Sequence, residues 1–146
     1  MPGYGETGCF LDPLEIRADC EGESVINVEM IQKAIAAHAN WKARLRTAVN
    51  TGKFDVAPAA VRVDNQCEFG KWLYGPDFTA ADKGTQSYRA AVNLHAKFHQ
   101  EAAKIVELAT SGNKDEADRA MSLAGSYTKA SSALTRELVQ WRQGLE

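Results

Sequence analysis

Proline is scarce in this sequence, and long apolar runs are missing from it. Four prolines occur, at positions 2, 13, 58 and 76, whereas alanine is abundant, and this balance favours helix. No apolar stretch approaches the roughly 20 residues that a membrane-spanning helix needs. The first residues also lack the basic start and apolar block of a secretory signal peptide. These absences predict a cytoplasmic, mostly helical protein without membrane insertion.

An excess of basic charge is missing as well. The chain has 17 lysines and arginines against 19 acidic residues, a formal net charge of −2 at pH 7. Because nucleic-acid-binding proteins usually present a basic face, no nucleic-acid partner is expected.

Cysteine is scarce as well, with Cys9, Cys20 and Cys67 as the three examples. An odd number of cysteines in a cytoplasmic chain indicates thiols or metal ligands rather than a disulfide framework.

The chain length of 146 residues is enough for one domain with a core of its own. Residues 1–23 hold glycines and two prolines without sustained periodicity, which predicts an irregular leader or linker. Residues 24–144 are expected to form a single helical domain. The final pair, Leu145 and Glu146, is typical of a cloning remnant and is left outside that domain.

Apolar residues recur at alternating three- and four-residue steps in three long stretches, which is the pattern of a helix with one buried face. The first stretch covers about residues 24–50 and ends before Gly52, a residue suited to the positive φ at a helix end. The next begins after a cap at Thr79 or Ser87 and runs to about residue 110. The last shows an unbroken repeat over residues 117–141.

Between the first two stretches the sequence indicates a shorter element. Residues 53–63 are expected to form a connection, after which Asp64 caps a short helix over residues 64–74. Gly75 and Pro76 then end that helix. No strand pattern competes with these assignments. The predicted fold class is all-α, a four-helix bundle with a short additional helix that carries Cys67.

All three histidines fall on the apolar stripes of the predicted helices. His95 and His99 are one helical turn apart, so their side chains project from the same face. His38 lies on the stripe of the first helix. Taken alone, the spacing of His95 and His99 is typical of two hydrogen-bonded core histidines. Burying three imidazoles without partners would, however, cost roughly 1–3 kcal/mol for each.

Cys67 is the one cysteine within the predicted helical region. With Asp64 as the cap it would occupy the third position of its helix, where the positive end of the helix dipole favours thiolate. The alternative is a small buried hydrophobic residue. Three imidazole nitrogens and one thiolate make a tetrahedral set that suits zinc. The sequence therefore predicts a Zn²⁺ site made by His38, Cys67, His95 and His99.

Four neighbouring residues complete the candidate site. Trp41 and Trp72 follow two of the candidate ligands on the same helices, where they fill the core and could also form a dry shell around the metal. Phe69 lies between Cys67 and Trp72 in the sequence. Gly70 in mid-helix costs roughly 1 kcal/mol relative to alanine, which favours a close approach of another helix at this point.

The pattern "HANW" at residues 38–41, "CEFGKW" at 67–72 and "HAKFH" at 95–99 resembles that of the chemoreceptor zinc-binding (CZB) domain family. That family has a histidine with an aromatic residue three positions on, a Cys-x-hydrophobic-Gly-x-aromatic element and an HxxxH pair. These elements occur here in the family's order, and the resemblance spans about residues 27–141.

The resemblance implies a four-helix bundle that dimerises and binds zinc through His38, Cys67, His95 and His99. It also implies a role in bacterial signal transduction, where such domains accompany chemoreceptor signalling helices or diguanylate cyclases. The input would be zinc itself or an oxidant, such as hypochlorous acid, that reacts with the zinc-bound cysteine. No such output domain fits in this chain, so either an excised domain or a separate partner is expected.

Other functions are less compatible with these residues. Four protein ligands leave no open position for substrate, which argues against an enzyme, and the HExxH motif of a zinc hydrolase is absent. A diiron or oxygen-binding bundle would need carboxylates beside the histidines, and none lies on their stripes. The remaining alternative is a metal-free helical module for interaction or dimerisation.

Overall fold

The computed structural model describes residues 26–145, and within them the chain forms seven helices and no strand. The three long helices are α3 (Val28–Thr51), α7 (Gln86–Thr110) and α9 (Ser126–Leu145). The four short helices are α4 (Pro58–Arg62), α5 (Glu68–Leu73), α6 (Ala80–Lys83) and α8 (Lys114–Ala120). The predicted leader, with Cys9 and Cys20, lies outside the described residues. The all-α fold class and the short helix at the cysteine are confirmed.

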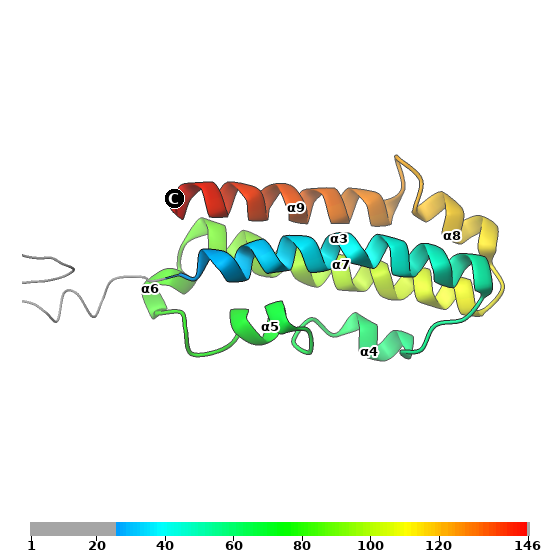
Figure 1. The fold of residues 1–146 in the computed structure, drawn as a ribbon, viewed down its shortest axis with the longest axis horizontal. Coiled ribbons are helices and arrows are strands. Elements are labelled where there is room, and N and C mark those ends of the chain that lie inside the picture. Colours follow the sequence, from blue (N-terminus) through cyan, green and yellow to red (C-terminus); the bar gives the residue numbers. More distant parts are fainter. Residues whose placement is uncertain (1–25, 146) are drawn as a thin grey trace, which may run out of the picture.

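The long helices run along the long axis of the molecule, and α4 and α5 follow one another on the side opposite α9 (Figure 1). The chain runs forward along α3, back through α4 and α5, forward along α7 and back along α9 (Figure 1). Helix α7 packs against α3, α4 and α9 and is therefore central. The result is an antiparallel bundle whose fourth side consists of two short helices. None of the helices within residues 26–145 is long and apolar enough to cross a bilayer.

The core is built from the apolar stripes of the long helices. Ile31 and Leu45 of α3, Phe98 of α7, and Leu134 and Leu138 of α9 are fully buried. Burying one such side chain stabilises the fold by roughly 1.5–3 kcal/mol. This core extends above and below the level of the histidines, so the helices that carry them are held by apolar packing along their whole length.

Helix ends follow ordinary capping chemistry. The Asn27 side chain accepts a hydrogen bond from the Glu29 backbone N–H at 3.0 Å, so α3 begins later than the predicted residue 24. It ends as predicted at Gly52, whose φ is 74°. Thr79 caps only the short α6, and Thr85 rather than Ser87 caps α7.

Two segments differ from the prediction. The expected connection over residues 53–63 contains α4, which begins at Pro58, where a fixed φ favours the first helical turn. The predicted unbroken last helix is interrupted between α8 and α9. At Gly125 a Cβ atom would lie 2.1 Å from the Ala120 carbonyl oxygen, so the chain folds back too tightly there for any larger residue. The buried apolar face continues from α8 to α9, because Ala117 and Tyr127 are both buried in the same core.

Candidate metal centre

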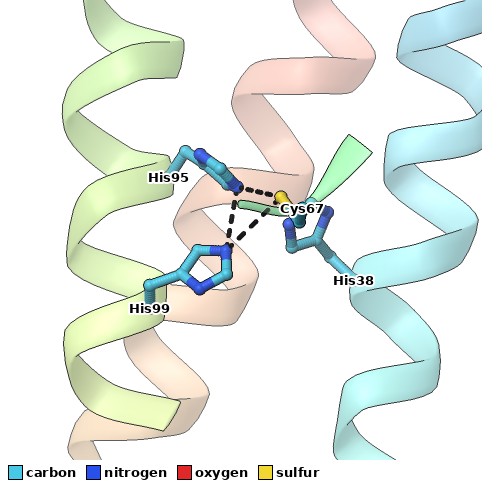
Figure 2. Close-up of side chains that lie close together, drawn as sticks. All are labelled: His38, Cys67, His95 and His99. Atoms are coloured by element: carbon cyan, nitrogen blue, oxygen red, sulfur yellow. Dashed lines mark hydrogen bonds between the residues drawn. The ribbon is translucent and has the colours of Figure 1, made fainter. Parts of the chain in front are cut away.

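Three separate parts of the chain bring His38, Cys67, His95 and His99 together (Figure 2). His38 lies on α3, His95 and His99 lie on adjacent turns of α7, and Cys67 directly precedes α5. One donor atom from each residue lies within 4.8 Å of every other. The three histidines are at most 4% exposed, and Cys67 is half-buried. The structure thus assembles all four predicted ligands in one cluster.

The distances within the cluster suit a tetrahedral metal ion. The Cys67 sulfur lies 3.3 Å from His95 Nε2 and 3.7 Å from His99 Nε2. The two Nε2 atoms lie 3.0 Å apart. Ligands of a tetrahedral zinc ion would be separated by about 3.3 Å for two nitrogens and about 3.6 Å for nitrogen and sulfur. The donor atoms of Cys67, His95 and His99 therefore already lie within a few tenths of an ångström of the spacing that zinc needs, and the His38 donor lies within 4.8 Å of each of them.

Backbone carbonyls determine which ring nitrogen faces the cluster. His38 Nδ1 lies 2.7 Å from the Ala34 carbonyl oxygen, and His99 Nδ1 lies 2.8 Å from the Val61 carbonyl oxygen. Because a carbonyl oxygen only accepts, each Nδ1 carries the proton and each Nε2 keeps a lone pair. This is the tautomer of a histidine that binds metal through Nε2. In His95, Nδ1 is buried and has no hydrogen-bond partner among the described residues.

Burial keeps the histidines neutral. It lowers the pKa of His38 to about 4 and that of His95 to about 2, the latter helped by the neighbouring His38 and His99. Burial also lowers the pKa of His99. Neutral imidazole is the form that binds a metal ion. At neutral pH these side chains are therefore ready to donate their lone pairs without first losing a proton.

The local position of Cys67 differs from the prediction. Cys67 is itself the N-cap of α5, and its sulfur accepts a hydrogen bond from the Gly70 N–H at 3.3 Å. Asp64 is not the cap, because its carboxylate accepts a hydrogen bond from the Tyr74 hydroxyl at 2.6 Å. Burial raises the pKa of the Cys67 thiol, and the backbone N–H groups offset this only in part. A helix end therefore does not suffice to form the thiolate, whereas a coordinated cation deprotonates a thiol outright.

Aromatic rings enclose the cluster. The ring of Phe69 lies 5.8 Å from that of His38 and 5.0 Å from that of His95. Phe98, which is fully buried, lies 4.9 Å from His38. The Trp41 ring lies 6.3 Å from that of His99. Phe98 was not predicted as part of this enclosure, although its place on the α7 stripe was a usable signal.

Trp72 fills the core as expected, whereas the close approach at Gly70 involves a different partner from the predicted one. The Trp72 ring packs against Phe69, Phe78 and Trp141, toward the end of the bundle, and not against the histidines. Gly70 does permit a close approach, but by the preceding loop rather than by another helix. A Cβ at Gly70 would lie 1.8 Å from the carbonyl oxygen of Asp64.

One buried carboxylate on α7 lies outside the cluster. Glu101 is 2% exposed and lies 3.1 Å from the Lys97 ammonium and 3.3 Å from that of Lys104. Burial opposes its ionisation, but these partners outweigh it, so the pKa of Glu101 lies below its usual value. The spacing of apolar residues along the chain does not indicate the burial of Glu101. Within the described residues, the one group of potential metal ligands contains histidine and cysteine only.

Comparison with known families agrees with this donor set. Residues 38–106 match the model of the family described as the chemoreceptor zinc-binding domain, CZB. Nothing among curated proteins and nothing among solved structures matches the chain. The matched segment contains all four residues of the cluster. CZB domains are regulatory domains of chemoreceptor signalling and not an enzyme family. Residues 38–106 are therefore similar to a CZB domain, and zinc is the cofactor that the matched family and the donor set indicate.

Proposed function

We propose that His38, Cys67, His95 and His99 hold one zinc ion in a closed regulatory site. The observation that carries this proposal is the meeting of four donor atoms within 4.8 Å inside the bundle. The tautomers of His38 and His99 leave lone pairs for the metal, and the sulfur completes a set that zinc prefers. When bound, the ion would supply the positive charge that holds Cys67 as thiolate.

A regulatory role fits this site better than catalysis. Four protein ligands complete a tetrahedral zinc site, which leaves no position for water or substrate. The diiron alternative lacks support because the cluster found within residues 26–145 contains no carboxylate. In the metal-free alternative, hydrogen bonds among Cys67, His95 and His99 would hold the cluster together in place of a cation.

The signal in this proposal is a change at Cys67. The domain senses zinc itself or an oxidant such as hypochlorous acid, which converts the sulfur to sulfenic acid and weakens it as a ligand. The same sulfur caps α5 through the Gly70 N–H, so a change at the sulfur also acts on the start of that helix. Residues 64–75 are the segment that we expect to move.

The output of this proposal is a partner in bacterial signalling. Residues 24–144 act as one domain, as a homodimer in the cytoplasm. They pass the change either to chemoreceptor signalling helices or to a diguanylate cyclase, and so to chemotaxis or cyclic-di-GMP signalling. The description of the family as a chemoreceptor domain supports this part of the proposal.

Metal content tests the ligand set. Protein purified without added metal is expected to contain one zinc per chain by mass spectrometry. Cys67→Ser and His95→Gln are each expected to lose most of that zinc. Gln100→Ala changes an exposed polar residue on the same helix as His95 and His99 and is expected to retain it. A folded, zinc-free wild-type protein would favour the metal-free interaction module.

Amide hydrogen exchange tests the moving segment. Oxidation of Cys67, or Cys67→Ala, is expected to speed exchange in residues 64–75, because α5 loses its attachment to the histidines and, in Cys67→Ala, also its cap. The Gln100→Ala variant serves again as the control and should exchange like the unmodified protein. Unchanged protection of residues 64–75 after oxidation would remove this segment from the mechanism.

A further inference from the structure

A small pocket opens on the surface of the bundle beside the metal centre, between α3 and the start of α5. Its volume is about 60 Å³. Exposed residues Lys33, Ala37 and Glu68 line it together with Cys67 and the buried His38. Because its lining includes both solvent-exposed residues and members of the donor cluster, the pocket connects solvent with Cys67.

The walls of this pocket are well fixed. Trp41 forms one wall, and the Arg44 guanidinium stacks over its ring at 4.5 Å. The Phe54 ring supports Trp41 from 5.9 Å. Phe69, which is 3% exposed and packed on the histidines, forms part of the opposite wall. Since large aromatic groups hold both sides, the width of the opening depends on the smaller residues between them.

We propose that this pocket is the route by which small oxidants reach Cys67, and that Ala37 sets the width of its mouth. The pocket volume of about 60 Å³ exceeds the roughly 10–15 Å³ that one bound water molecule needs on the same measure. The pocket therefore has room for hydrogen peroxide, and a bulkier hydroperoxide with a branched alkyl group is expected to enter it less readily. Ala37 is the small exposed residue of the lining, one turn of α3 before Trp41. The proposal rests on the proposed role of Cys67 as an oxidant-sensitive zinc ligand.

The reaction admitted by this route is a two-electron oxidation. The Cys67 thiolate attacks the outer oxygen of hydrogen peroxide, a sulfur–oxygen bond forms and the oxygen–oxygen bond breaks. Hydroxide leaves and takes a proton from solvent to become water. Sulfur is oxidised to sulfenic acid, and the peroxide is reduced. A tertiary alkyl hydroperoxide undergoes the same exchange with an alkoxide as the leaving group, so the two reagents differ mainly in size.

The test uses the full chain with Cys9→Ser and Cys20→Ser, so that Cys67 is the remaining thiol. Ala37→Leu narrows the mouth. Ala39→Leu makes the same change at another exposed position of α3 that does not line the pocket, and is the matched control. Sulfenic acid at Cys67 is followed by a specific trapping reagent and mass spectrometry, which separates it from oxidation of Met30 in the same lining. Each protein is measured with zinc and after zinc removal.

Ala37→Leu is expected to slow oxidation by hydrogen peroxide about tenfold, which corresponds to about 1.4 kcal/mol on the barrier. Ala39→Leu should react like the parent. For each reagent, the rate of Cys67 oxidation in the parent is divided by the rate for a free thiol. This relative rate should be lower for tert-butyl hydroperoxide than for hydrogen peroxide. Equal rates for Ala37→Leu and Ala39→Leu, in both the zinc-loaded and the zinc-free state, would overturn the route. Zinc content measured in parallel separates the proposal of a zinc site from the proposal of an oxidant route. An absence of zinc would refute the zinc site, and the oxidation rates of the zinc-free proteins would still test the route through the pocket.

Discussion

The ring nitrogens of His38 and His99 are divided between the backbone and the donor cluster. His38 binds a carbonyl of its own helix, that of Ala34, whereas His99 binds the Val61 carbonyl of α4. No side-chain substitution removes a carbonyl, so the orientation of these rings is fixed by the fold itself. For His99, that orientation depends on the position of α4 against α7, two elements that pack closely.

Burial of the histidines predicts that the zinc-free protein is acid-sensitive. An unfolded histidine has a pKa of 6.5, whereas the pKa is about 4 in folded His38 and about 2 in His95. As the pH falls below 6.5 the unfolded chain therefore binds more protons, and the free energy of unfolding decreases. The free energy of unfolding then decreases by up to about 1.4 kcal/mol per pH unit for each histidine that stays unprotonated in the folded protein.

Guanidinium unfolding of zinc-free protein at about pH 7.5 and about pH 5.5 measures this effect. The midpoint should fall at the lower pH, and His38→Gln should show a smaller decrease because one of the protected groups is gone. Equal midpoints at the two pH values would mean that the histidines are solvated in the zinc-free protein.

At the scale of elements, α5 is held against the preceding loop at Gly70. The Asp64 carbonyl occupies the space that a side chain would need, and Cys67 lies between the two residues in the sequence. The backbone contact therefore sets where the cysteine sulfur is placed. Three residues further on, Leu73 is fully buried, so α5 is anchored at both ends.

Gly70→Ala is expected to lower both stability and zinc affinity. The added methyl group would lie 1.8 Å from the Asp64 carbonyl oxygen, so the loop must move, at a cost of about 1–3 kcal/mol. Gly144→Ala is the matched control, because nothing lies within 4 Å of the added Cβ and alanine favours helix by up to about 1 kcal/mol. Thermal unfolding and competition with a zinc chelator measure the two effects. A Gly70→Ala protein as stable and zinc-bound as Gly144→Ala would contradict the tight contact.

Local spacing predicted the long helices and placed all three histidines on buried stripes, since the burial of an amphipathic helix face follows from its own sequence. It could not predict α4, which has five residues and one buried apolar side chain, Val61, too few to show a period. The partner of His99 was equally hidden, because the Val61 carbonyl is 38 positions away. The start of α5 was misplaced because Asp64 is a good cap by type, yet its carboxylate binds Tyr74.

At the scale of the whole molecule, the bundle has a core that is independent of the metal centre. The fully buried Leu45, Ile105, Leu134 and Leu138 connect α3, α7 and α9. This differs from a zinc finger, which has little apolar core and is unfolded without its metal. Zinc would therefore add stability to a fold that already exists.

Removal of zinc is expected to lower the unfolding temperature while most of the helical circular dichroism remains. A ligand at a thousandfold excess over its dissociation constant stabilises the native state by about 4 kcal/mol. Cys67→Ser, compared with and without added zinc, should show little of this difference. Loss of most helical signal on chelation of the wild-type protein would show that the apolar core is insufficient on its own.

The packing of Trp72 against Trp141 gives the protein an optical reporter of its own. One indole belongs to α5 and the other to α9, and their ring centres lie 6.1 Å apart at an angle of 34°. Trp72 is 8% exposed, so departure of α5 would transfer its indole to water and shift its fluorescence emission to the red. The same departure would abolish the near-ultraviolet exciton coupling of the pair. Movement of the cysteine-bearing helix could thus be followed in real time, in unlabelled protein, while the metal is bound or withdrawn.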